Sequence, residues 1–155
     1  GEISERLGIP EGTPLPRPIV EYYLKDDRLA LPMVAEEHIV AFGWATQQDL
    51  DDIIALALRV NDFMSGVMMG VGIRLADFRI EVGRIWEGEY MRLIVADEIS
   101  PDSCRLWDLR GLTDRGDGAP IPEPGPLPDV YTELARRLGV LPSNVTHPMK
   151  PTLIN

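Results

Sequence analysis

The stretch from residue 73 to residue 108, IRLADFRIEVGRIWEGEYMRLIVADEISPDSCRLWD, decides the fold of this chain. Apolar and charged residues alternate along 78–82, which is typical of a strand because successive side chains point to opposite faces. Gly88 has a glutamate on either side and marks a turn, and residues 90–96 form a strongly apolar second arm. The pattern predicts an antiparallel hairpin that turns at Gly88.

Charged side chains gather where the two arms of this hairpin end. With the turn at Gly88, Asp97 returns close to Arg79 and Glu81, to within a residue or two of register. Carboxylates held this close repel one another unless a cation or a shared proton offsets their charge. Two interpretations stay open. One is a solvated polar face that Arg79 neutralises, and the other is a metal–phosphate site, for which oxygen ligands favour magnesium or calcium.

The composition is that of an ordinary globular protein, with 155 residues, of which 45% are apolar and 26% charged. The net charge of −10 argues against nucleic acid or an anionic membrane as a partner, but not against an anionic substrate. Cys104 is the only cysteine, which excludes an intrachain disulfide and fits a reducing, cytoplasmic compartment. The chain has no unbroken apolar run of about 18 residues, so we expect no membrane span.

The segments around the hairpin predict an α+β fold, in which an antiparallel hairpin-based sheet packs against helices. The longest helix is expected from Thr46 to about residue 69, because apolar residues recur there every three and four positions and form a stripe to be buried. Thr46 and Asp49 have the spacing of a capping box at its start. Because the chain opens at Gly1 directly into a helical stretch, we expect further sequence to precede it in the gene.

Three regions are expected along the chain. Residues 1–112 form the α+β region, residues 113–128 form a loop rich in glycine and proline, and residues 129–155 form a helix and an extended tail. The hairpin and the longest helix fall in the first region. Residues 1–112 are therefore expected to hold the candidate substrate- and metal-binding site.

Two further charged segments flank the predicted strands. Lys25 and Asp27 follow a β-branched and aromatic strand at 19–24, and they form either a solvated turn or a second charged loop that faces the hairpin. Ser100 stands beside a proline, which suits a tight turn. Arg105 follows that turn and either pairs with a nearby aspartate, at 102 or 108, or holds a substrate phosphate in its planar fork.

The segments described above resemble the second half of the SAICAR synthetase family, the phosphoribosylaminoimidazole-succinocarboxamide synthases. The resemblance covers nearly the whole chain except 113–128 and the tail. The longer hairpin and the motif SPDSCR at 100–105 resemble those of the alphaproteobacterial branch of the family. The segments that carry the resemblance are RLGIPEG at 6–12, YLKDD at 23–27, AFGW at 41–44, NDF at 61–63, DFRIE at 77–81, ADEISPDSCRLWD at 96–108 and ARRLG at 135–139.

The resemblance implies an ATP-dependent ligase of purine biosynthesis that joins L-aspartate to carboxyaminoimidazole ribotide through an acyl phosphate. ATP and Mg²⁺ are the implied cofactors, and a homo-oligomer is implied as the assembly. By the same resemblance, Glu81 and Asp97 match the carboxylates that hold the metal and the nucleotide phosphates. Asp77 and Arg79 match the catalytic segment beside the reacting carboxylate, where Arg79 replaces a lysine. Arg105 matches the arginine that holds the ribotide phosphate.

Four more residues match substrate-side segments of the family. Ser100 and Asp102 lie on the substrate-side turn, and Lys25 and Asp27 match a charged loop. Other positions depart from the family pattern: Glu2 stands in place of a hydroxyl, Leu31 stands in place of an aspartate, and the family's first half, a β-rich lobe over ATP, has no counterpart. These departures keep a second hypothesis open, namely a non-catalytic fragment or paralogue that binds the ribotide or a partner chain.

Overall fold

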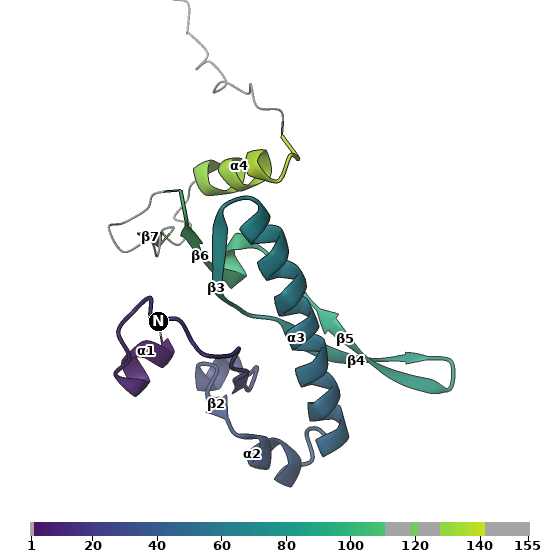
Figure 1. Ribbon diagram of the computed structural model, residues 1–155. Coiled ribbons are helices and arrows are strands. Elements are labelled where there is room, and N and C mark those ends of the chain that lie inside the picture. The colour runs from purple at the N-terminus through teal and green to yellow at the C-terminus, as the bar shows by residue number, and fades with distance from the viewer. Residues whose placement is uncertain (1, 111–118, 121–127, 142–155) are drawn as a thin grey trace, which may run out of the picture. The chain divides into compact units, whose positions relative to one another are not determined.

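A computed structural model describes residues 2–110, 119–120 and 128–141 (Figure 1). These residues combine helices with antiparallel strand pairs, which confirms the predicted α+β class. The elements in chain order are α1 (Glu2–Leu7), β1 (Tyr22–Tyr23), the 3-10 helix η1 (Asp27–Leu29), β2 (Met33–Val34), α2 (Glu36–Ala41), α3 (Gln47–Gly70), β3 (Ile73–Phe78), β4 (Glu81–Glu87), β5 (Tyr90–Ala96), the 3-10 helix η2 (Pro101–Ser103), β6 (Cys104–Asp108), β7 (Ala119–Pro120) and α4 (Pro128–Arg137).

The described residues fall into two compact units. The first is drawn from Gly1–Ser65 and Ile80–Glu98, and the second from Gly66–Arg79 and Ile99–Asn155. The predicted division into 1–112, 113–128 and 129–155 remains a prediction, because most of 113–128 and all of 142–155 lie outside the described residues. Within 113–128, the two residues of β7 pair with β6.

The predicted hairpin is present in the first unit as β4 and β5. The two strands pair antiparallel from Glu81 opposite Ala96 to Glu87 opposite Tyr90. Gly88 takes φ 64°, a left-handed conformation that glycine adopts without steric cost, so the turn lies where the sequence predicts it. The apolar second arm, expected at 90–96, is confirmed as β5.

The first arm of the stretch is not one continuous strand. β3 ends at Phe78 and β4 begins at Glu81, so the alternation through 78–82 spans a break rather than one strand. The physical reason is that the two segments have different partners: β3 pairs with β6, from Ile73 opposite Asp108, whereas β4 pairs with β5. The ends of the 73–108 stretch therefore pair with each other, as a long hairpin requires.

Helix α3 begins with the predicted capping box. The Thr46 backbone N–H donates to Oδ2 of Asp49 at 2.8 Å, and the Asp49 N–H donates to Oγ1 of Thr46 at 3.1 Å. Arg84 of β4 adds a third bond, from its Nη2 to the same Asp49 oxygen at 2.7 Å. Hydrogen bonds from Thr46, and then from Arg84, lower the pKa of Asp49. One carboxylate thus caps the helix and fastens the hairpin to it.

The apolar stripe of α3 is less buried than its spacing predicts. Leu50 and Met68 are buried, but most of the stripe is half-buried, and Val67, expected inside, is exposed. By length and composition α3 could cross a membrane, and 6% of its apolar window is buried. The sequence predicted no membrane span because it contains no unbroken apolar run. By helix length and mean hydropathy, however, α3 does qualify as a candidate span. Long helices in the cores of water-soluble proteins pass the same test.

Tyr22, in β1 of the first unit, buries its hydroxyl without a hydrogen-bond partner of acceptable geometry among the described residues. Burial raises its pKa from 10.0 to about 12, with smaller contributions from the charge and a poorly aligned hydrogen-bonding contact of Glu36 and from the charge of Asp51. The unfolded chain therefore loses this proton at lower pH than the folded chain does. Between pH 10 and about pH 12 this difference lowers the free energy of unfolding.

Replacing Tyr22 by phenylalanine is expected to remove this decrease in the free energy of unfolding at alkaline pH. At neutral pH the free energy of unfolding of the variant should lie within about 1 kcal/mol of the parent's, because the buried hydroxyl has only a poorly aligned contact with Glu36 to lose. Urea unfolding at pH 8 and pH 11 measures both effects. The control is Tyr23→Phe, since the Tyr23 hydroxyl is on an exposed side chain and donates to Glu21 at 3.1 Å. An equal effect at Tyr23 would contradict this assignment.

The core of the second unit lies where β3, β6 and α4 supply its buried residues. Ile73 is 1% exposed and Leu106 4%, and Leu134 of α4 is also buried. Arg137 of α4 donates to both carboxylate oxygens of Asp108 in β6, at 3.0 and 2.6 Å. The Arg137 side chain is 9% exposed, so this forked ion pair is largely shielded from water.

Removing the Arg137 side chain by substitution with methionine is expected to lower the free energy of unfolding at pH 7 by about 2–3 kcal/mol, because Asp108 loses its charged partner. Arg137 lowers the pKa of Asp108 from 3.8 to about 2. The stability from this pair is present above pH 3.8 and is lost as the pH falls through about 2. Denaturant unfolding at pH 7 and below pH 2 should therefore show a difference between variant and parent that shrinks in acid.

The matched control for this prediction is Arg136→Met. The Arg136 guanidinium pairs with Glu133 on the same helix, and its side chain is 38% exposed, so its loss should cost about 0.5 kcal/mol or less. A cost at Arg136 equal to that at Arg137 would show that the Asp108 pair is not what anchors α4.

Candidate active site

In the first unit, the hairpin register sets two of the predicted carboxylates at the same end. Glu81 opens β4 opposite Ala96, the last residue of β5, and Asp97 follows directly. Asp97 takes φ 69°, a left-handed conformation that aspartate tolerates better than most residues, and its Oδ1 accepts the N–H of Glu98 at 2.9 Å. Strained backbone of this kind is concentrated at functional sites.

Lys25 lies against the hairpin rather than in a turn that faces only water. Its Nζ forms an ion pair with Oε2 of Glu81 at 2.5 Å. The two side chains are 69% and 40% exposed, so the pair adds little to stability and both groups stay within reach of a ligand. Asp27, the other predicted residue of this loop, begins η1, directly after Asp26 has capped that helix through the N–H of Arg28. Of the two interpretations of this loop, the structure supports the charged loop that faces the hairpin.

In the second unit, Arg105 pairs with Asp77 across the sheet. The two residues stand opposite each other in the register of β3 and β6, and Nη1 of Arg105 lies 3.4 Å from Oδ2 of Asp77. The structural partner expected from the sequence, at 102 or 108, is therefore wrong. The reason is the non-local register, which shifts at a bulge between Leu75 and Asp77. The guanidinium is about one-third exposed, so a ligand can reach it.

The tight turn expected at Ser100 is present and is closed by hydrogen bonds. Ser103 donates its Oγ–H to the Ser100 carbonyl, and the Ser100 N–H donates to that Oγ, both at 3.0 Å. The Ser103 carbonyl accepts the N–H of Arg79 at 2.8 Å, which ties the turn to the predicted catalytic segment. The carboxylate of Asp102 accepts a hydrogen bond from the Tyr131 hydroxyl of α4.

The predicted site residues are thus divided between the two units. The first unit holds Lys25, Asp27, Glu81 and Asp97, and the second holds Asp77, Arg79, Ser100, Asp102 and Arg105. Sequence reasoning missed Tyr131, which reaches Asp102 from 29 positions away. Its only signal in the sequence is a tyrosine in the first turns of the predicted C-terminal helix.

Few side chains of the site could coordinate a metal ion. No group of three or more histidine, cysteine, aspartate or glutamate side chains in the described part of the chain could hold one. Magnesium, however, commonly uses one or two carboxylates and takes its other ligands from water and substrate phosphates. Glu81 and Asp97, at the same end of the hairpin, fit that requirement, and they fit it only together with a phosphate ligand.

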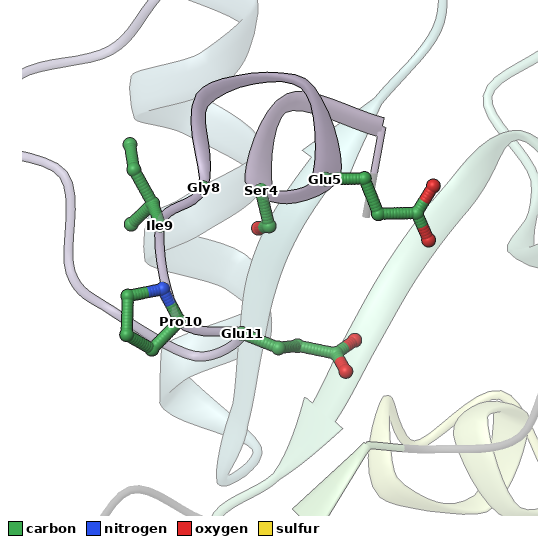
Figure 2. A pocket seen from close by; sticks show the side chains of 6 residues that line it. All are labelled: Ser4, Glu5, Gly8, Ile9, Pro10 and Glu11. Carbon is green, nitrogen blue, oxygen red and sulfur yellow. The ribbon is translucent and has the colours of Figure 1, made fainter.

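A separate hollow lies in the N-terminal segment. It has a volume of about 330 Å³ and is open to solvent (Figure 2). Figure 2 shows the carboxylates of Glu5 and Glu11 extending to the same side. The hollow contains none of the predicted site residues, so we assign it no role in the chemistry. Its lining residues are Ser4, Glu5, Gly8, Ile9, Pro10 and Glu11.

Known proteins with similar sequences align with this chain over its whole length. The chain is 68% identical over 155 residues to the phosphoribosylaminoimidazole-succinocarboxamide synthase of Dinoroseobacter shibae, and 63% identical to that of Jannaschia sp.. Each alignment covers 100% of this chain but 61% of the relative. The chain therefore spans about three fifths of the length of the curated relatives it matches.

Solved structures show the same fold. The crystal structure of the synthase from Ehrlichia chaffeensis matches with a TM-score of 0.80 and 39% identity, over 92% of this chain and 60% of that one. A SAICAR synthetase in complex with ADP matches with a TM-score of 0.74 and 32% identity, over 91% of this chain and 59% of that one. The sequence profile described as SAICAR synthetase matches residues 1–119. With this profile match, the close relatives and the shared fold, the chain belongs to the SAICAR synthetase family.

Proposed function

We propose that this chain supplies the substrate and metal side of a cytoplasmic, homo-oligomeric ligase, which uses ATP to join L-aspartate to carboxyaminoimidazole ribotide. The observation that carries the proposal is the register of β4 and β5, which sets Glu81 beside the strained Asp97. Two carboxylates at one strand end suit a divalent cation, and a nucleotide phosphate would complete its coordination. The ADP complex of a relative with 32% identity supports a nucleotide as that ligand.

In this proposal Glu81 and Asp97 would hold a magnesium ion, which would supply positive charge to offset the charge that develops on the phosphates of ATP. Lys25 is ion-paired with Glu81. Because both side chains are partly exposed, Lys25 would be able to turn from Glu81 toward a phosphate of the nucleotide. The lysine then adds a positive charge where negative charge gathers.

The second unit positions the ribotide. Arg105 receives the ribotide phosphate on the donors of its guanidinium, and Asp77 orients that guanidinium from the opposite strand. Arg79 stands beside the reacting carboxylate. That carboxylate attacks the γ-phosphorus of ATP to give an acyl phosphate and ADP. The amine of L-aspartate then attacks the acyl carbon, phosphate leaves, an amide bond forms and the amine proton passes to solvent.

Release of ADP tests the proposal. The purified chain is mixed with magnesium, ATP, L-aspartate and the ribotide, and each component is omitted in turn. The same assay is run on this chain joined to the part of the Dinoroseobacter shibae relative that it does not cover. Release that requires all four components, from either form, supports the ligase. Failure of both forms to release ADP would contradict it.

The second candidate is a non-catalytic chain that binds the ribotide or a partner. Leu31 favours it, because it stands where the family resemblance places an aspartate. Its φ of 51° is also a left-handed conformation that leucine adopts only at a cost. Ribotide binding by calorimetry, without ADP release from either form in the assay above, would support this candidate over the ligase.

A further inference from the structure

We propose that Tyr131 is a positioning residue, which holds the carboxylate of Asp102 in place for a substrate amine or hydroxyl group. The inference rests on the proposed function and adds a residue to it. The Tyr131 hydroxyl donates to Oδ2 of Asp102, and both residues belong to the second unit. Among the described residues, no protein group donates a hydrogen bond to Oδ1 of Asp102, so that oxygen can accept one from a ligand.

Docking of α4 has other contacts besides this hydrogen bond. The helix is anchored to β6 at its C-terminal end, where Arg137 donates two hydrogen bonds to Asp108. Leu134 adds buried apolar surface. The Tyr131 ring is 40% exposed, so its burial contributes less. The hydrogen bond of the hydroxyl therefore acts on Asp102, while other contacts dock the helix.

Asp102 lies in the turn that reaches the predicted catalytic segment. It is the middle residue of η2, and the next residue, Ser103, accepts the backbone N–H of Arg79 at 2.8 Å. A hydrogen bond from a phenol to a carboxylate is charge-assisted and directional, so it selects one orientation of the carboxylate. The hydrogen bond from α4 to Asp102 thus stabilises the turn whose Ser103 carbonyl binds the Arg79 N–H.

The first test needs no catalysis and uses amide hydrogen exchange in the chain itself. Tyr131→Phe removes the hydroxyl alone. The Arg79 amide should then exchange about 5- to 10-fold faster, because the turn loses one stabilising bond. The internal control is the Leu138 amide, which donates to the Leu134 carbonyl just past the C-terminal end of α4 and should not change. An unchanged Arg79 amide would overturn the inference, and so would equal acceleration at both amides.

The second test is steady-state kinetics on whichever form releases ADP. Tyr131→Phe should raise KM for L-aspartate or for the ribotide by about 5- to 10-fold with little change in kcat, and the substrate affected identifies the group that Asp102 binds. Combined with Asp102→Asn, it should add no further loss, since both act through one carboxylate. Additive losses would overturn the inference. Absence of ADP release by the parent would instead count against the proposed function, and the exchange test would still decide the role of Tyr131.

Discussion

Asp97→Asn is expected to lower turnover at least 100-fold while leaving the fold intact. The substitution removes the negative charge of a carboxylate that we propose as a ligand of the magnesium ion. Asparagine tolerates the left-handed backbone at φ 69° as aspartate does, and its side-chain oxygen can still accept the Glu98 N–H. ADP release measures the first effect and urea unfolding the second.

The matched control for Asp97 is Glu98→Gln, which removes one negative charge from the adjacent, exposed residue. Turnover of the control should stay within about 2-fold of the parent, since exposed charges are screened by salt. If Asp97→Asn unfolds the chain, or if both substitutions reduce turnover alike, Asp97 has a structural or a general electrostatic role and the site assignment fails.

Arg105→Ala is expected to weaken binding of the ribotide by about 10- to 100-fold, the loss that follows from removing a charge-assisted contact to phosphate. Binding of ATP should change little. Stability should also change little, because the partner Asp77 is 56% exposed and water can solvate it. Calorimetric titration with each ligand separates these effects.

Two further variants sharpen the test of Arg105. Arg105→Lys keeps the charge but loses the planar fork, so its ribotide affinity should fall between those of the parent and the alanine variant. Arg92→Ala removes an exposed arginine that pairs with Glu87 on the hairpin, and ribotide binding should not respond. Equal losses for ribotide and ATP in Arg105→Ala would remove the phosphate role from this residue.

The features that the sequence predicts correctly are local ones. Thr46 and Asp49 are three residues apart, and Gly88 shapes its own turn, so each pattern contains the whole physical cause of the structure. The break between β3 and β4 has no such cause. The alternation of side chains continues through it, and only the different partner strands separate the two segments.

The candidate site shows the same limit. The sequence placed Asp97 beside Glu81 because one turn determines that register. It did not predict that Asp77 would be the partner of Arg105, or that Tyr131 would reach Asp102, since both contacts depend on how distant segments pack. The roles proposed for all these residues in binding and catalysis remain predictions, which the substitutions above test.

The shared carboxylate of Asp49 has a consequence for the order of folding. Thr46 can bind it as soon as the first turn of α3 forms, but Arg84 is 35 positions away and must first close a long loop. The ion pair should therefore form late, after the rate-limiting step of folding. Loss of Arg84 would then speed unfolding of the first unit more than it slows folding, so this contact governs how long the folded hairpin persists.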